Sequence, residues 1–384
     1  HQKNQIKLTY APELGYQQGD STKMAFCPTT NPLEDHPDFQ VTSYGVDVLS
    51  RDHDQPFFLA CGIYRPHEPW FVPKKYFDRF PLEKIRLPPG YTAGDLNDLP
   101  PEGKKRGPNR YFAHIQENRQ WKNAIQGYLA SISFADEMLG RVLDSLERGP
   151  NARNTIVILW SDHGWHLGEK QHWQKYSPWR ACTRVPLMIR VPRGISSLAE
   201  GTNPGTVCDQ PVNLVSLFGT LSELAGISKS PQTKAPSLVP LLRDPHANWP
   251  HHSTTFLADG GSVGISLKRY RYIRYQNGEE ELYDIKKDPF EWTNLATLKS
   301  QENRILELRK LVPAHFSKLK LPSVKSLPKL PWVPEKRLES IPVSTPDGSS
   351  FDCYFINKTK QDVKLHWMDR KGKPRFYAVI QSGG

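Results

Sequence analysis

Two continuous apolar runs, each followed by polar residues, stand out in the hydrophobic pattern of the chain. Residues 56–62 (PFFLACG) end at a glycine, and residues 155–160 (TIVILW) lead directly into Ser161 and Asp162. Apolar runs without alternation are typical of parallel strands that are buried on both faces. The sequence therefore predicts two core strands here, and residues 185–191 (VPLMIRV) predict a third.

Helical and alternating patterns fill the segments around these runs. Apolar residues recur on one stripe between residues 118 and 148, which predicts one long amphipathic helix. Shorter helices are predicted near residues 39–51, 211–227 and 302–311. Alternation at 264–276 and 280–285, with Asn277 and Gly278 between them, predicts an antiparallel hairpin. The pattern as a whole predicts an α/β sandwich with a mostly parallel central sheet and a small antiparallel sheet after it.

The last part of the chain has a different pattern. Residues 321–346 contain prolines spaced among Lys and Ser, which is typical of an extended linker. Beyond it, residues 351–356, 363–367 and 376–380 alternate as short strands. We therefore divide the chain into a first domain over 1–320, a linker over 321–346 and a partial all-β module over 347–384. The chain starts without Met and stops just after a strand-like run, so we expect truncation at both ends.

Charge is distributed unevenly along the 384 residues. The formal charge is +11, but residues 299–384 hold 17 Lys and Arg against 8 Asp and Glu, a net of +9, which leaves +2 for the first 298 residues. The first domain thus gives no strong nucleic-acid signal. The basic region is either a solubilising linker or a surface for an acidic polymer such as a polysaccharide, for nucleic acid or for a membrane. No apolar run reaches the roughly 18–20 residues of a membrane span.

Polar groups that can do chemistry follow the second predicted strand. Asp162 and His163 stand side by side, and Lys175 follows at a distance. A carboxylate and an imidazole are ligand types for a divalent cation, and a nearby lysine can neutralise an anion. Alternatively, Ser161 and Asp162 only cap a following helix, as these residue types often do. The combination with Leu-Gly-Glu and the lysine favours a metal site.

A second polar cluster follows the first predicted strand. His67 stands between two prolines in the segment 64–70 (YRPHEPW). A restricted loop suits a general acid or an anion ligand, although an exposed loop histidine without a role would have the same local sequence. Ligands gather at the carboxyl ends of strands in open α/β sheets. We therefore expect His67, Lys175 and the Asp162–His163 pair to converge at one edge of the sheet.

Taken together, these segments resemble the sulfatase family of the alkaline-phosphatase-like superfamily. The matching stretches are residues 57–62 with 65–67, residues 161–170 (SDHGWHLGEK), Lys175 before residues 185–188 (VPLM), residues 211–227, and residues 281–296 (ELYDIKKDPFEWTNLA). The resemblance is closest to the iduronate sulfatase branch, which shares Asp-His-Gly-Trp. It implies an alkaline-phosphatase-like α/β fold and hydrolysis of sulfate esters in sulfated sugars or polysaccharides such as glycosaminoglycans.

The resemblance also implies roles for single residues. Asp162 and His163 match two of the ligands of one Ca²⁺ ion. Lys175 matches the lysine that binds the sulfate ester, and His67 matches the histidine at the sulfate and the leaving oxygen. Trp165 sits where the iduronate branch lines the sugar subsite. The family also implies export to the periplasm, the lysosome or the extracellular space, with no signal peptide visible in this sequence.

The family's nucleophile has no counterpart in the sequence. Sulfatases need Cys or Ser in a Cys/Ser-x-Pro-x-Arg motif, whose side chain becomes formylglycine, together with an earlier acidic pair and a Lys-x-x-His. None of these occurs here. Cys27 directly precedes a proline and no Arg follows, so we expect a surface-loop thiol or half of a disulfide. The resemblance then implies a nucleophile upstream, an incomplete Ca²⁺ ligand set, and a chain that is inactive by itself.

The C-terminal module has a resemblance of its own. Residues 351–359 (FDCYFINKT), 363–367 (VKLHW) and 377–383 are similar to part of the β domain of the von Hippel–Lindau protein. A generic β-hairpin would show the same alternation.

Two other functions stay open. A phosphodiesterase or phosphomonoesterase of the same superfamily would use a Thr or Ser nucleophile and two zinc ions. It should carry a further His and Asp set, and it would leave Lys175 without a clear role. A decayed sulfatase joined to a β recognition module would bind sulfated glycan without catalysis. The sequence of the upstream segment would distinguish all three.

Overall fold

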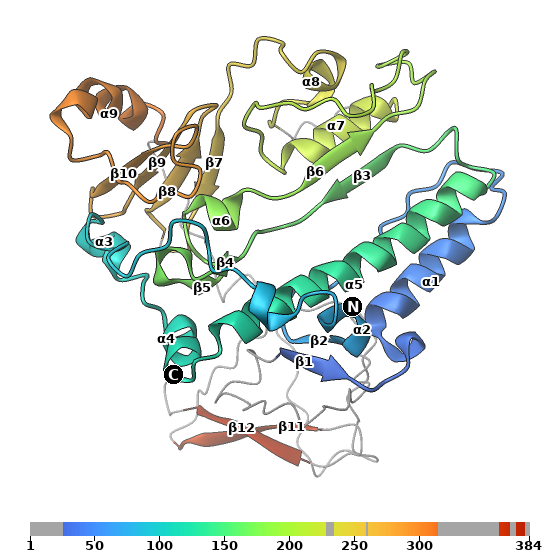
Figure 1. The fold of residues 1–384 in the computed structure, drawn as a ribbon. Helices are drawn as coiled ribbons and strands as arrows, with labels where there is room; N and C mark the ends of the chain where they lie inside the picture. The colour runs from blue at the N-terminus through green and yellow to red at the C-terminus, as the bar shows by residue number, and fades with distance from the viewer. Residues whose placement is uncertain (1–25, 228–233, 259, 314–360, 369–373, 381–384) are drawn as a thin grey trace. The chain divides into compact units, whose positions relative to one another are not determined.

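The structure is a computed structural model, and it describes residues 26–227, 234–258, 260–313, 361–368 and 374–380 (Figure 1). The chain divides into two compact units, Gln5–Phe316 and Ser317–Gly384 with His1–Asn4. The helices of the first unit are α1 (Pro37–Leu49), α2 (Lys74–Phe77), α3 (Pro101–Lys104), α4 (Arg110–Glu117), α5 (Trp121–Arg148), α6 (Arg180–Thr183), α7 (Ser216–Leu224), α8 (Val239–Arg243) and α9 (Glu302–Arg309). Its strands are β1 (Phe26–Thr29), β2 (Trp70–Pro73), β3 (Val157–Trp160), β4 (His166–Leu167), β5 (Trp173–Gln174), β6 (Leu187–Arg190), β7 (Ser253–Phe256), β8 (Val263–Ser266), β9 (Tyr270–Arg274) and β10 (Glu280–Asp284).

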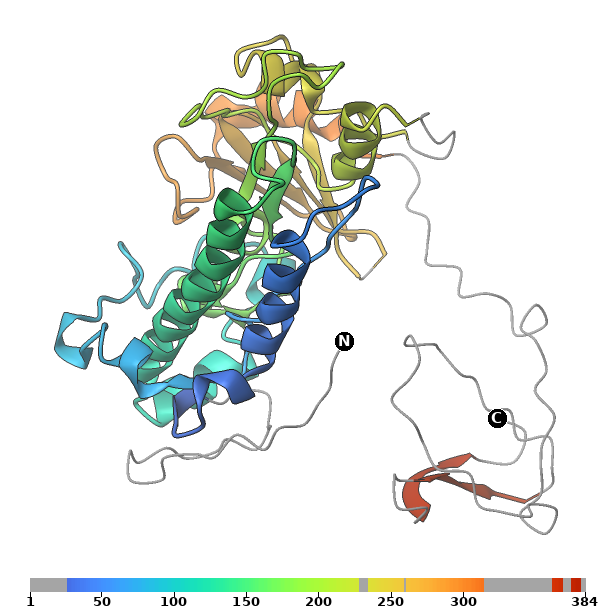
Figure 2. The ribbon, with the colours of Figure 1, turned by 90° about the vertical axis from the view of Figure 1, so that its right-hand side faces the viewer.

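The long helix α5 packs along α1, and both views show the two running side by side (Figures 1 and 2). Apolar positions with helical spacing, such as Phe134 and Met138, bury one face of α5. On the same face Arg141 donates to the hydroxyl oxygens of Thr42 and Ser43 at 2.8 and 2.9 Å. The predicted long helix is confirmed, and it begins at Trp121. Within the described ranges, no helix combines the length and the apolar character needed to cross a membrane.

The strands before residue 200 pair two by two. β1 and β2 are parallel, whereas β3 and β6 are antiparallel, with Ile158 opposite Ile189. The mixed α/β class is confirmed, but among the described residues parallel pairing is limited to β1 and β2. A parallel neighbour needs a long crossover, usually through a helix. The α-helix between β3 and β6 is the four-residue α6, which is too short for such a crossover. The chain therefore returns beside β3 in the opposite direction.

The first predicted core strand is wrong. Residues 56–62 are not part of a strand, and the side chain of Phe58 is 81% exposed. An apolar run has the composition of a buried strand, but a strand forms only where a neighbour accepts and donates the ladder hydrogen bonds. The second and third predicted strands exist as β3 and β6, yet Trp160 and Met188 on them are exposed.

An aromatic core lies in the first unit between β1, β2 and α5. Trp70 contacts both Trp165 and Trp173, with ring centroids 5.9 Å apart in each pair. Phe112 is also fully buried in this cluster. Cys27 belongs to β1 and is buried, so the expectation of a surface-loop thiol is wrong. The local sequence around this cysteine is rich in proline, but pairing with β2 places it in the interior.

The small antiparallel sheet is confirmed and has the strand order β10-β9-β8-β7. The predicted turn between β9 and β10 contains Gly278 with φ 91°, a backbone conformation that favours glycine. Ile305 and Leu308 of α9 pack against Val263 and Leu282 of this sheet. Residues 264–276 were predicted as one strand, and they form β8 and β9 with a turn between them.

In the second unit, β11 (Val363–Met368) and β12 (Pro374–Ile380) pair antiparallel, with Val363 opposite Ile380. The predicted linker over 321–346 and the predicted strand over 351–356 lie outside the described residues. The boundaries of the predicted β module and its resemblance to the von Hippel–Lindau domain therefore stay predictions.

Candidate functional site

Three nitrogen atoms from different loops meet in the first unit. Nζ of Lys175 lies 3.0 Å from Nε2 of His67 and 2.9 Å from Nε2 of His163. His67 precedes β2, His163 follows β3, and Lys175 follows β5. The structure thus brings together three of the residues that the sequence assigned to the site.

Backbone carbonyls fix both imidazole rings. Nδ1 of His67 donates to the carbonyl of Glu68, and Nδ1 of His163 donates to the carbonyl of Gly164, each at 2.8 Å. A carbonyl oxygen can only accept, so each Nδ1 carries hydrogen. In the neutral rings each Nε2 therefore presents its lone pair to the ammonium group of Lys175. Lys175 donates to both rings.

The surroundings of His67 favour its neutral form. Burial lowers the pKa of His67, the hydrogen bond to the Glu68 carbonyl opposes this effect, and the charge of Lys175 lowers the pKa further. The hydroxyl of Tyr64 lies 3.0 Å from Nδ1 of His67 and donates to the same carbonyl at 2.9 Å. Sequence reasoning missed Tyr64, which stands three positions before His67 in the same loop.

Asp162 lies at the open side of the site. Its side chain is 75% exposed, and Oδ2 lies 3.7 Å from Nε2 of His163. β4 follows it in the chain, so the alternative of a helix cap is wrong. Ca²⁺ takes about 6–8 oxygen-rich ligands, whereas these two residues supply one carboxylate and one imidazole. In the described ranges no group of three or more His, Cys, Asp or Glu side chains is placed to hold a metal ion. The residues present do not fit a calcium ion, and we assign no step to one.

The indole ring of Trp165 packs against the imidazole rings of His67 and His163. Its ring centroid lies 5.5 Å from that of His67 and 6.1 Å from that of His163, and the residue is 8% exposed. Trp70 packs edge-on against the indole, and Tyr128 stacks against it. The structure therefore places Trp165 in the core beneath the site, where it offers no open face to a sugar.

Neighbouring residues hold the segment that carries Lys175. Nε2 of His172 lies 2.9 Å from the carbonyl oxygen of Lys175, and Nδ1 lies 2.7 Å from that of Arg106. The side chain of Gln174 donates to the carboxylate of Glu68, which joins this segment to the loop of His67. The sequence showed His172 without a role, because its partner Arg106 is distant in the chain.

A second lysine of the same block is buried. Lys170 is 1% exposed, and its backbone N–H and its Nζ both donate to Asp95 at 2.8 Å. Glu281 from the antiparallel sheet accepts hydrogen bonds nearby from three buried aromatic side chains, those of Trp179, Tyr275 and Tyr283. This network attaches residues 170–180 to the antiparallel sheet.

Two family models match the chain. A model described as sulfatase matches residues 7–227, which is more than half of the chain. A model described as the C-terminal part of N-sulphoglucosamine sulphohydrolase matches residues 168–315. The two overlap across the segment of Lys175, and together they reach the end of α9. The chain belongs to the sulfatase family.

Individual relatives agree with this assignment. A sulfatase from Formosa agariphila is 39% identical over 280 residues, which cover 72% of this chain and 53% of that protein. Iduronate 2-sulfatase from Mus musculus is 34% identical over 241 residues, which cover 54% of this chain and 43% of that protein. The resemblance to the iduronate sulfatase branch is thereby confirmed. The chain spans about half the length of the curated relatives it matches.

Solved structures share the fold. A phosphonate monoester hydrolase from Silicibacter pomeroyi matches with a TM-score of 0.61 and 19% identity, covering 81% of this chain and 69% of that chain. A protein solved in complex with its substrate D-glucosamine-2-N,6-O-disulfate matches with a TM-score of 0.54 and 22% identity, covering 72% and 68%. These similarities confirm the predicted alkaline-phosphatase-like fold.

Proposed function

We propose that this chain is the part of a sulfuric ester hydrolase that binds the sulfate group of a sulfated saccharide. The observation that carries the proposal is the meeting of Lys175 with His67 and His163. An ammonium group has three N–H donors, and the two imidazoles take two of them. The third is left for an oxygen of an anion. The relatives support a sulfate ester as that anion, since they are named sulfatase and iduronate 2-sulfatase.

In this proposal Lys175 offsets the negative charge of the ester, and His67 assists the departure of the leaving oxygen. When the bond between sulfur and the ester oxygen breaks, that oxygen must gain a proton. Nε2 of neutral His67 has no hydrogen and accepts from Lys175, so His67 orients the ammonium group. A proton then passes from Nζ of Lys175 directly to the leaving oxygen, which leaves Lys175 as a neutral amine. Lys175 is therefore both the charge partner of the sulfate and the source of the proton.

The proposal places the nucleophile upstream of this sequence. In the family this residue is formylglycine, which would supply the nucleophile for the sulfur. We expect residues 1–384 to bind a sulfate ester without hydrolysing it, and to bind Ca²⁺ weakly or not at all. Calorimetry that finds micromolar Ca²⁺ binding would contradict the second expectation. The proposal also includes export of the complete protein, as the family implies.

The test restores an upstream segment with Cys-x-Pro-x-Arg and supplies the enzyme that oxidises its cysteine. The repaired protein should hydrolyse aryl and sugar sulfates. Lys175→Ala in that protein should lower kcat/KM by about 10²–10³, the usual effect of removing one charged contact to the transition state. The exposed Lys268→Ala is the matched control and should keep full activity. Equal activity of both variants would contradict the role of Lys175.

A phosphodiesterase or phosphomonoesterase is the second candidate. The structural similarity to a phosphonate monoester hydrolase favours it. The same repaired protein decides between the two, because a phosphoesterase should hydrolyse phosphate or phosphonate esters faster than sulfate esters. A protein that hydrolyses neither but binds sulfated glycan would be the non-catalytic binding protein.

A further inference from the structure

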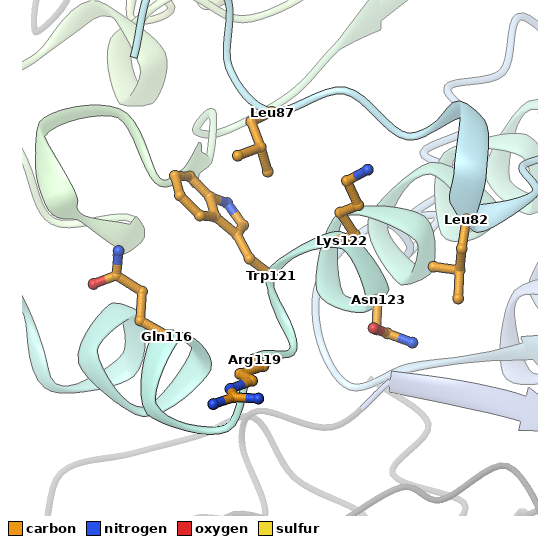
Figure 3. Close-up of a pocket in the computed structure, with 7 residues that line it drawn as sticks. All are labelled: Leu82, Leu87, Gln116, Arg119, Trp121, Lys122 and Asn123. Atoms are coloured by element: carbon orange, nitrogen blue, oxygen red, sulfur yellow. The ribbon is translucent and has the colours of Figure 1, made fainter. Parts of the chain in front are cut away.

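A cavity of about 460 Å³ opens where α4 meets α5 (Figure 3). None of its lining residues belongs to the site of Lys175. Figure 3 shows that Arg119 comes from the turn between the two helices and that Trp121 and Lys122 come from the start of α5. Leu82 and Leu87 line it from the segment that precedes both helices.

One part of the cavity is apolar and rigid. The indole nitrogen of Trp121 donates to the carbonyl of Leu167 at 2.7 Å. Tyr91 and Phe112 pack edge-on against the ring, each with its centroid 4.8 Å away. Leu82 and Leu87 expose their side chains to solvent. A fixed aromatic ring with aliphatic neighbours suits the C–H face of a sugar ring.

The other part of the cavity is positively charged. Arg119 and Lys122 line it, and no carboxylate does. In the part of the chain that the structure describes, neither cation forms an ion pair. Helix α5 has no acidic residue in its first turn and no side-chain cap, so its first N–H groups add positive potential. The cavity therefore suits an anion.

The backbone at Arg119 ends helix α4 beside the cavity. Arg119 has φ 56°. Its N–H bonds to the carbonyl of Gln116 at 3.0 Å, and the N–H of Gln120 bonds to that of Ile115 at 2.9 Å. This is the Schellman ending of a helix, where glycine is the usual residue in the left-handed position. This turn fixes the backbone of Arg119 where its side chain lines the cavity.

We propose that this cavity is a second, non-catalytic site for a sulfated saccharide. Arg119 and Lys122 bind a sulfate group, and Trp121 packs against the sugar ring that carries it. The choice of a sulfated saccharide among anions with an apolar face rests on the proposed function. A polymer with many sulfate groups can occupy this site and the site of Lys175 through different units, which raises its effective concentration at Lys175.

The test follows Trp121 itself, because the basic region over 299–384 can also bind a polyanion. The full chain is labelled with 5-fluorotryptophan, and the ¹⁹F resonance of Trp121 is assigned as the one that Trp121→Phe removes. A size-defined heparin hexasaccharide should shift this resonance saturably, and the desulfated hexasaccharide should not. Arg119→Gly should weaken the binding at least tenfold without lowering thermal stability, since glycine fits the backbone there. Arg119→Lys should keep most of the affinity.

The outcomes separate this inference from the proposed function. An unshifted Trp121 resonance, or equal binding by the wild type and Arg119→Gly, would overturn the second site. An equal response to the desulfated hexasaccharide would overturn its assignment to sulfate. Lys175→Ala should leave the Trp121 titration unchanged while it weakens the binding of a small aryl sulfate at least tenfold. If the Trp121 results are as expected but Lys175→Ala does not weaken the binding of the aryl sulfate, the proposed function is contradicted. The second site is then still supported as an anion site.

Discussion

Lys170 and Lys175 stand close together in sequence and have opposite surroundings. Lys170 is buried and pairs through its backbone and its side chain with Asp95. Lys175 is partly exposed. Among the described residues the polar contacts of its side chain are the imidazoles of His67 and His163, with no ion pair to a carboxylate. Asp95 compensates the charge of Lys170 within the protein, whereas no ion pair among the described residues compensates that of Lys175.

The contrast separates structural charge from functional charge. Burying an ammonium group is unfavourable unless a carboxylate compensates it, so Lys170 depends on Asp95. Neutral imidazoles orient Lys175 without cancelling its charge. The two lysines should therefore respond to substitution in opposite ways, one in stability and the other in anion binding.

The largest expected effect is on the buried pair. Asp95→Ala should lower the free energy of unfolding by about 3–5 kcal/mol, because it leaves the ammonium of Lys170 buried without compensation. Denaturant titration measures the change. Lys175→Ala is the matched control and should shift the same free energy by less than about 1 kcal/mol. Equal effects of the two variants would remove the distinction between the lysines.

Substitution of Glu281 should give the next largest effect on the free energy of unfolding. Its carboxylate is fully buried and accepts three hydrogen bonds from aromatic side chains. Glu281→Gln keeps the size but replaces one acceptor oxygen by an amide group that cannot accept. The loss should be about 1–3 kcal/mol in the free energy of unfolding, the usual cost of unsatisfied buried donors. Thermal unfolding that matches the wild type would show that the network does not stabilise the antiparallel sheet.

A pH-dependent effect should come from His36. Like Lys170 it is buried. Burial and then the charge of Arg65 lower the pKa of His36 to about 4, and the opposing effect of Asp35 is smaller. Below pH 6.5 His36 binds a proton in the unfolded chain but stays neutral in the folded chain until about pH 4. The free energy of unfolding therefore falls as the pH is lowered through this window. The loss is at most about 1.4 kcal/mol per pH unit.

His36→Gln removes this titration. Its free energy of unfolding should fall less than that of the wild type between pH 6.5 and pH 4.5, with the two proteins compared against their own values at pH 8. Parallel pH profiles would contradict the lowered pKa of His36.

The sequence predicted the elements whose signals are local. The apolar stripe of α5 and the Asn277-Gly278 turn between β9 and β10 depend on neighbouring residues only, and both were correct. The residues of the site were expected from the polar clusters after the predicted strands and their roles from family resemblance, and the structure brings Lys175, His67 and His163 together. Their local sequence alone gave no distances between loops.

The failures share a physical cause, which is dependence on distant partners. Residues 56–62 have the composition of a core strand, but no strand of the described part of the chain pairs with them. Cys27 is buried because β1 pairs with β2, whereas the prolines near it predict an irregular loop. The pairing of Lys170 with Asp95 joins residues far apart in the chain, and the backbone strain at Arg119 leaves no trace in the residue pattern.

The central claim is that the ammonium of Lys175 binds the sulfate group of an ester. Residues 1–384 carry no formylglycine motif, so we expect an aryl sulfate to bind without being consumed during a titration. Calorimetric titration of the wild type with 4-nitrophenyl sulfate should show saturable binding. Lys175→Ala should weaken it at least tenfold, or about 1.4 kcal/mol, while Lys268→Ala leaves it unchanged. Equal dissociation constants for the wild type and Lys175→Ala, or no binding by the wild type, would contradict the account.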